Sequence, residues 1–122
     1  MKNRESELRK RSYLFAVNII KFIDTLNRKD RTIQVIIDQL SKCSTSVGAN
    51  IFEAQAGSSK KDFTKFFTYA LKSANESKFW LGLLKDTQKA DKDQATNLLD
   101  EVFEIANMLG SSILTLKGKK EL

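Results

Sequence analysis

The sequence predicts an all-α protein folded as an antiparallel up-down-up-down four-helix bundle. Its 122 residues include no proline, the residue that most strongly interrupts helices, and only five glycines. Apolar residues recur at intervals of three and four along four long segments. Short polar stretches separate these segments, and such connections join antiparallel neighbours in a bundle. We therefore expect one domain spanning residues 1–122.

The first predicted helix runs from about Ser12 to Leu26. Two adjacent apolar stripes give it the wide buried face that a bundle helix needs. They consist of Phe15, Ile19, Phe22 and Leu26, and of Ala16, Ile20 and Ile23. Residues 1–11 are charged and lack periodicity, so we expect a flexible or helical N-terminal extension.

The second predicted helix runs from about Arg31 to Ala56, and Asp30 can cap its start. Gly57 stands where a helix-ending glycine in the left-handed conformation is expected. The predicted inward positions are Ile33, Ile36, Ile37, Leu40, Cys43, Val47 and Ile51.

The third predicted helix is capped by Ser59, with Asp62 three residues on, and runs to about Asp86. Asp91 and Gln94 repeat the capping pattern before a fourth helix over about residues 92–116. We expect Gly118 and a basic tail, residues 118–122, to follow this helix. The predicted inward positions are Phe63, Phe66, Phe67, Ala70, Ala74, Ser77, Leu81 and Leu84 in the third helix, and Ala95, Leu98, Val102, Ile105, Leu109, Ser112, Ile113 and Leu116 in the fourth.

Gly48, Gly82 and Gly110 fall inside predicted helices, where each costs on the order of 1 kcal/mol relative to alanine. Close approach of another helix, from the same bundle or a neighbouring subunit, is the usual compensation. The small residues around Gly48 extend such a surface, and a ligand groove is the alternative. The predicted packing or interface residues are Ser46, Gly48, Asn50, Glu53 and Glu76.

Asn50, Glu53 and Glu76 are polar residues close to apolar stripes. They fit buried hydrogen bonds that fix helix register, or a contact between subunits. Paired carboxylates in a bundle could alternatively serve metal binding or acid–base chemistry.

The chain contains no histidine, which excludes Ser-His-Asp and Cys-His catalysis and most zinc sites. Its one cysteine, Cys43, lies on an apolar stripe and fits a buried core residue, the alternative being a reactive thiol. No disulfide can form within one chain, as suits a reducing compartment. We therefore expect a protein that is not an enzyme and has no cofactor.

No apolar run approaches the roughly 18 residues of a membrane span. The N-terminus is charged and has no signal-peptide core behind it. The expected location is the cytoplasm, with no membrane partner.

Basic residues dominate one end of the predicted bundle. The formal net charge is +6, and the antiparallel order gathers the N-terminus, the second connection and the C-terminus at this end. Its candidate nucleic-acid-binding residues are Arg9, Lys10, Arg11, Lys60, Lys61, Lys65, Lys117, Lys119 and Lys120. This set fits a surface for backbone phosphates, and solvated charge at the chain ends is the alternative. No aromatic residue is interleaved with these cations as a stacking platform requires, so we do not expect base-specific readout.

Several runs of residues carry a family resemblance. They are Thr45-Ser46-Val47-Gly48-Ala49-Asn50-Ile51-Phe52-Glu53-Ala54, Ser58-Ser59-Lys60-Lys61-Asp62-Phe63, and Glu76-Ser77-Lys78-Phe79-Trp80-Leu81. The chain from about Ser12 to Lys117 resembles the bacterial "four helix bundle protein" family, which includes proteins encoded within intervening sequences of large-subunit ribosomal RNA genes. The sequence departs from the family pattern at Lys42 and Asn75, where many members carry arginine, and at Phe52, where a small residue is usual.

The family is similar to the accessory variability determinant of diversity-generating retroelements, a barrel-like homopentamer of four-helix subunits that binds nucleic acid and a reverse transcriptase. The resemblance therefore implies a homo-oligomer, a pentamer, with a basic surface, and RNA, DNA and a reverse transcriptase as candidate partners. We expect a non-enzymatic protein that binds RNA or DNA through backbone phosphates. The alternative is a protein–protein interaction scaffold or accessory subunit without direct nucleic-acid binding.

Overall fold

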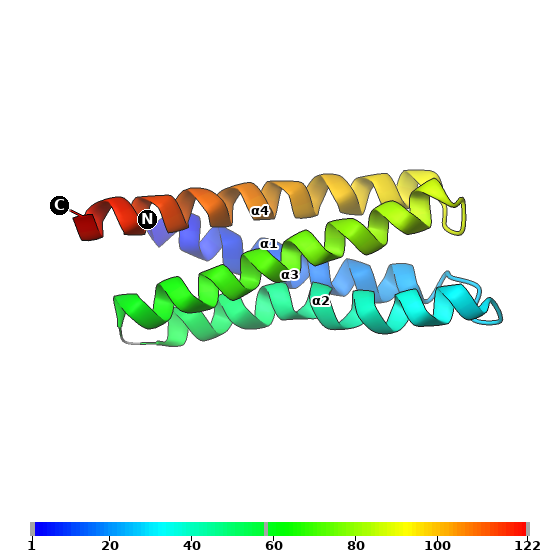
Figure 1. Cartoon of the computed structure of the whole chain (residues 1–122), viewed down its shortest axis with the longest axis horizontal. Helices are drawn as coiled ribbons and strands as arrows, with labels where there is room; N and C mark the ends of the chain where they lie inside the picture. Colours follow the sequence, from blue (N-terminus) through cyan, green and yellow to red (C-terminus); the bar gives the residue numbers. More distant parts are fainter. Residues whose placement is uncertain (1, 58, 122) are drawn as a thin grey trace.

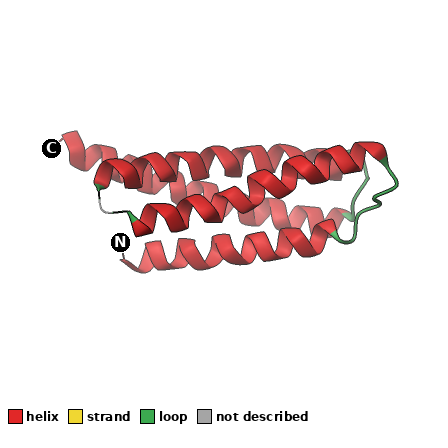
Figure 2. Cartoon of the chain, turned by 90° about the horizontal axis from the view of Figure 1, so that it is seen from below, coloured by secondary structure: helices red, strands yellow, loops and turns green. Residues whose placement is uncertain are grey.

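The structure, a computed structural model, describes residues 2–57 and 59–121, and this part of the chain consists of four helices without strands. They are α1 (Lys2–Ile23), α2 (Arg31–Ala56), α3 (Lys60–Asp86) and α4 (Lys92–Glu121). Each helix packs against the next in the chain, and α4 closes the ring against α1 (Figures 1 and 2). The predicted fold class, an antiparallel up-down-up-down bundle, is confirmed.

The predicted apolar stripes form the core. Ile19, Leu40, Leu81 and Leu109 are fully buried, one in each helix. Every predicted inward position of α2 and α4 is buried. The prediction fails at Ile20, which is 53% exposed because the inward face of α1 is narrower than its apolar face. None of the described helices is long and apolar enough to cross a membrane.

Three side chains cap helix starts as the sequence predicts. Asp30 accepts a hydrogen bond from the backbone N–H of Ile33 (3.1 Å) at the start of α2. Ser59 accepts one from Asp62 (3.0 Å) at the start of α3. Asp91 accepts one from the N–H of Gln94 (2.9 Å) before the first turn of α4. Each bond satisfies an N–H that has no partner within its helix.

The N-terminal extension, expected to be flexible or helical, is helical, and α4 is longer than predicted. Helix α1 already begins at Lys2, and Leu8 and Ser12 are fully buried, so the N-terminal extension is helical and contributes to the core. At the other end, α4 continues through Gly118 to Glu121. A lone glycine weakens a helix by about 1 kcal/mol without ending it when the preceding turns are packed.

The left-handed residue expected at Gly57 occurs elsewhere. Gly57 has φ −74° and ψ 160°, an extended conformation, and its N–H donates to the carbonyls of Glu53 and Ala54. Gln88 instead has φ 58°, just after α3. There the N–H groups of Gln88 and Lys89 donate to the carbonyls of Lys85 and Leu84, which is the Schellman arrangement.

Replacing Gln88 with glycine is expected to stabilise the protein by about 1 kcal/mol, because glycine adopts positive φ without the steric penalty of a Cβ atom. Urea denaturation followed by circular dichroism measures the change. Gly57→Ala is the matched control, since extended backbone accepts any side chain and we expect little change there. A large loss of stability in Gly57→Ala would show that Gly57 needs the left-handed conformation after all.

Within the described part of the chain, Gly48 is the one predicted close-packing glycine that another helix approaches. A Cβ atom added to Gly48 would lie 3.4 Å from both the carbonyl oxygen and the hydroxyl of Ser12, so α1 and α2 approach closely here. Beyond the neighbouring backbone of its own helix, a Cβ atom at Gly82 or Gly110 would have no described atom within 4 Å. The expectation of close packing inside the bundle is therefore wrong for these two, and packing against a neighbouring subunit stays a prediction.

Candidate nucleic-acid interface

The antiparallel order brings three distant segments to one end of the bundle. Figure 1 shows the N-terminus, the α2–α3 connection and the C-terminus together, and the other two connections at the opposite end. One small cleft is lined by Glu5 from α1, by Gly57, Ser59, Lys60 and Phe63 around the α2–α3 connection, and by Leu116 from α4. We call this end of the molecule the basic end.

Four of the predicted phosphate-binding lysines line one cleft at the basic end. The cleft measures about 410 Å³, and its lining residues are Lys60, Lys61, Thr64, Lys65, Leu116 and Lys117. Lys60, Lys61 and Lys65 lie in the first two turns of α3, whose N-terminus carries the positive end of the helix dipole. Lys65 also lies 3.7 Å from Asp62, an exposed pair of small energetic value.

Arg9 and Lys10 line a second cleft, of about 380 Å³, on the outer side of α1 and α2. The other lining residues are Ser6, Tyr13, Leu14 and Phe52. The Arg9 guanidinium lies 4.7 Å from the centre of the Phe52 ring. The expectation that no aromatic residue lies among the cations is therefore wrong. The sequence could not show that Phe52 lies beside Arg9, because Phe52 is in another helix. Tyr13 was detectable from the sequence, because it follows Arg9 by one helical turn.

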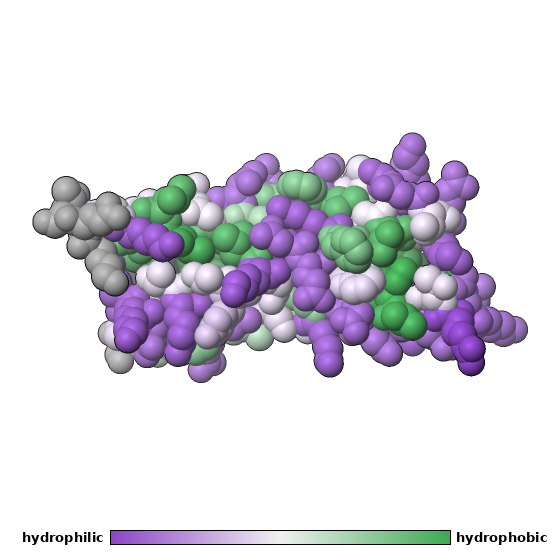
Figure 3. All heavy atoms as spheres, viewed as in Figure 1, coloured by the Kyte–Doolittle hydropathy of each residue, from purple (hydrophilic) through white to green (hydrophobic). Residues whose placement is uncertain are grey.

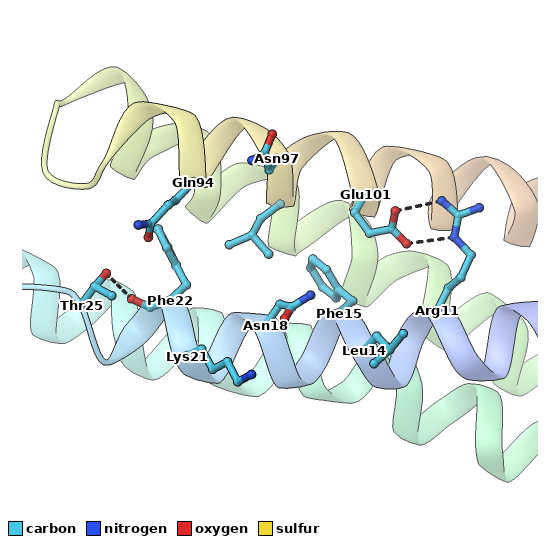
Figure 4. A pocket seen from close by; sticks show the side chains of 11 residues that line it. Arg11, Leu14, Phe15, Asn18, Lys21, Phe22, Thr25, Gln94, Asn97 and Glu101 are labelled. Carbon is cyan, nitrogen blue, oxygen red and sulfur yellow. Dashed lines mark hydrogen bonds and ion pairs between the residues drawn. The ribbon is translucent and has the colours of Figure 1, made fainter.

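Arg11 faces a different neighbour from the other predicted cations. Its Nε and Nη2 atoms each donate to a carboxylate oxygen of Glu101 on α4, both at 2.9 Å (Figure 4). A carboxylate oxygen of Glu7, one turn earlier in α1, lies 3.5 Å from Nη1. The hydrogen bonds to Glu101 raise the pKa of the Arg11 guanidinium. Arg11 thus links α1 to α4. The side chains of Lys119 and Lys120 lie outside the described part of the structure.

Comparison with known families shows which family this protein belongs to. Residues 4–111 match the family described as 23S rRNA-intervening sequence protein. The chain belongs to this family. A crystal structure of a protein of unknown function from the S23 ribosomal protein family of Bacteroides thetaiotaomicron is 33% identical and superimposes with a TM-score of 0.83, covering 90% of this chain and 97% of that one. A comparison with curated proteins found no match.

The predicted packing residues of this intervening-sequence family member divide between two faces. Gly48 lies against Ser12 of α1. Ser46 and Asn50 follow Cys43 by three and seven residues, so they lie on the same face of α2 as Cys43, which contacts Ser77 of α3. Asn50 donates to the Ser46 carbonyl oxygen within α2 (2.8 Å).

Glu53 and Glu76 are exposed, so the interpretation as buried register-fixing groups is wrong for both of them. Glu76 accepts a hydrogen bond from the indole N–H of Trp80 on the surface of α3 (3.1 Å). An exposed carboxylate suits a subunit contact, and that interpretation stays a prediction.

Cys43 is a core residue. Its side chain is 5% exposed, and the Ser77 hydroxyl donates to its sulfur at 3.3 Å. Burial raises the pKa of the Cys43 thiol, which disfavours the reactive thiolate. Among the described residues, no three acidic or cysteine side chains cluster as a metal site requires.

A long groove of about 590 Å³ separates α1 from α4, the most sparsely packed neighbours in the ring. Figure 4 shows Phe15 and Phe22 along it, with the polar side chains of Asn18, Gln94 and Asn97 beside them. The Arg11–Glu101 pair spans the groove. This bidentate pair joins α1 to α4 at one end of the groove.

A double-mutant cycle on Arg11→Met and Glu101→Gln should give a coupling energy of about 1 kcal/mol, because the pair is bidentate and part-buried. The coupling should fall with added salt. Urea denaturation of the four proteins measures it. The control cycle uses Arg28 and Asp24, an exposed pair at 3.5 Å, where we expect less than about 0.5 kcal/mol. Equal coupling in the two cycles would contradict a special role for Arg11.

Proposed function

We propose that this 23S rRNA-intervening sequence protein is a non-enzymatic homo-oligomer that binds RNA or DNA through backbone phosphates at the basic end. One observation carries the proposal: Lys60, Lys61, Lys65 and Lys117 converge on one cleft at the N-terminus of α3. Clustered ammonium groups beside the free N–H groups of a helix attract phosphate oxygens.

The opposite end of the bundle supports the proposal by contrast. Its cations are interleaved with carboxylates: Lys89 binds Asp30, and Arg28 lies 3.5 Å from Asp24. Asp86 lines the cleft there together with Lys85 and Lys92. A polyanion would therefore meet compensated charge at that end and a lysine cluster at the basic end.

Assembly into a homo-oligomer is part of the same proposal, with the pentamer implied by the resemblance. The face turned to the viewer in Figure 3 is mostly hydrophilic, with apolar patches between the charged side chains. Tyr69, Phe79 and Phe103 are 45%, 58% and 49% exposed. Contiguous patches of exposed apolar side chains are typical of surfaces that bind another protein.

Light scattering and fluorescence anisotropy over a salt series test the proposal, with a labelled RNA hairpin and a DNA duplex as probes. We expect a multimer, and binding whose logarithm falls linearly with log salt, with a slope of about −0.9 per phosphate contacted on duplex DNA. Binding that ignores salt, or no binding at low salt, would contradict the phosphate contacts.

A protein–protein interaction scaffold is the second candidate function. Three rings of α3 favour it, because Tyr69 is exposed and Phe66 and Trp80 pack against the core while staying partly accessible. A purified oligomer that binds no nucleic acid at low salt would favour this candidate. The reverse transcriptase implied by the resemblance stays a prediction.

A further inference from the structure

We infer that Tyr13 and Phe52, flanked by Arg9 and Lys10, form a stacking site for an unpaired nucleobase, so that the preferred ligand is single-stranded RNA or DNA. This inference rests on the proposed function and names the kind of nucleic acid. It starts from the second cleft, on the outer side of α1 and α2.

The two rings come from different helices and are both open to solvent. Tyr13 is 59% exposed and Phe52 is 40% exposed. Their ring centres lie 6.5 Å apart, with an angle of 39° between the planes. Neither ring belongs to the buried core, so the packing of the bundle does not account for their presence.

The surrounding backbone holds the two rings in place. Gly48 lies against Ser12, and without a side chain at Gly48 the two helices come close at this level. Phe52 follows Gly48 by one turn, and Tyr13 follows Ser12 directly. Nearer the N-terminus, the Gln55 side-chain amide donates to the Glu5 carbonyl oxygen at 2.7 Å. The aromatic pair is therefore supported on both sides by contacts between α1 and α2.

Cations lie directly beside the rings. Arg9 stacks over Phe52 at 4.7 Å, and Lys10 lines the same cleft. Leu14, 46% exposed, extends the apolar surface of the cleft. An aromatic face next to a guanidinium and an ammonium is the combination that binds single strands, since the base stacks and its flanking phosphates meet the cations.

Base pairing decides which nucleic acid can use this cleft. In a duplex, neighbouring base pairs cover both faces of each base, and only the edges and the backbone are accessible. A ring such as Tyr13 or Phe52 can therefore stack only on an unpaired base. Phosphate contacts at the lysine cluster make no such distinction.

The test measures binding of the full-length protein to four labelled 12-nucleotide probes. They are oligo(U), oligo(dT), a duplex, and an abasic strand that keeps the phosphates and lacks the bases. We expect the wild type to bind the two normal strands roughly 5- to 100-fold more tightly than the abasic strand. Oligo(U) and oligo(dT) separate RNA from DNA, and the stacking site predicts similar gains for both over the abasic strand.

The double variant Tyr13→Ala/Phe52→Ala should lose this gain for normal strands, and its binding to the abasic strand and the duplex should stay within about twofold. Tyr13→Leu/Phe52→Leu keeps apolar volume without a ring and should lose the gain as well. Val35→Ala, at an apolar side chain 56% exposed on α2, is the control and should behave as wild type. Circular dichroism verifies that each variant is folded.

Three results would overturn the inference. Equal binding of normal and abasic strands by the wild type would leave phosphate binding intact and remove stacking. A smaller oligomer in light scattering, with strand binding unchanged in the double variant, would assign the two rings to a contact with a second copy of the chain. No binding to any probe at 50 mM salt would reject both the stacking site and the proposed function.

Discussion

Changing Lys60, Lys61 and Lys65 together to glutamate is expected to weaken binding to every nucleic-acid probe by on the order of 100-fold or more at low salt. The variant removes three ammonium groups from the lysine cleft and replaces them with carboxylates that repel phosphate. The loss should be alike for all sequences, because phosphate contacts carry no base information. The slope of log affinity against log salt should also become shallower.

The variant should remain folded, since negative charge in the first turn of α3 interacts favourably with the helix dipole. Its matched control is Lys29→Glu/Lys85→Glu/Lys92→Glu at the opposite end. Both variants lower the formal charge from +6 to zero, so they differ only in where the charge changes. Fluorescence anisotropy over a salt series compares them. Equal losses would assign binding to net charge rather than to the basic end.

Phe67→Ala is expected to reduce the free energy of unfolding by about 3–5 kcal/mol. Phe67 is fully buried in α3, and its ring lies 4.3 Å from that of Phe63. Alanine would leave a cavity that the surrounding helices fill only partly. Because a domain of this size is stable by only roughly 5–15 kcal/mol, this loss is a large fraction of its stability, and the urea midpoint should fall markedly.

Urea denaturation measures the effect, and Phe79→Ala is the control on the same helix. The same chemical change at Phe79, which is 58% exposed, should cost less than about 1 kcal/mol, mainly through its contact with Trp80. Similar losses at the two positions would mean that Phe79 is buried in the assembled protein, which would identify it as a subunit contact.

The helices were predictable because their signals are local. Apolar spacing marks the buried face of α2 at every predicted position, and Asp30, Ser59 and Asp91 each cap the turn that they begin. Both features depend on residues three or four apart, which a helix brings together whatever surrounds it. The basic end was also predictable, because short connections impose antiparallel order.

The errors arose where packing opposed a local preference. Gly57 is extended and Gln88 is left-handed, although glycine has the greater freedom to adopt positive φ. The backbone conformation after each helix depends on the direction in which the chain leaves it, and that direction depends on where the next helix packs. Residues 2–11 looked unpatterned, yet Leu8 is buried because α1 extends along the bundle.

The sequence by itself determined the helices, their order and the end of the molecule at which positive charge gathers, because these follow from periodicity and connection length. Only the tertiary structure decided which cations act together. In the folded protein Arg11 forms an ion pair with Glu101, and the Arg9 guanidinium lies over the Phe52 ring. Lys60, Lys61 and Lys65 line one cleft. These contacts join residues that are far apart in the chain, so they depend on the rotation and separation of whole helices, which no local pattern specifies.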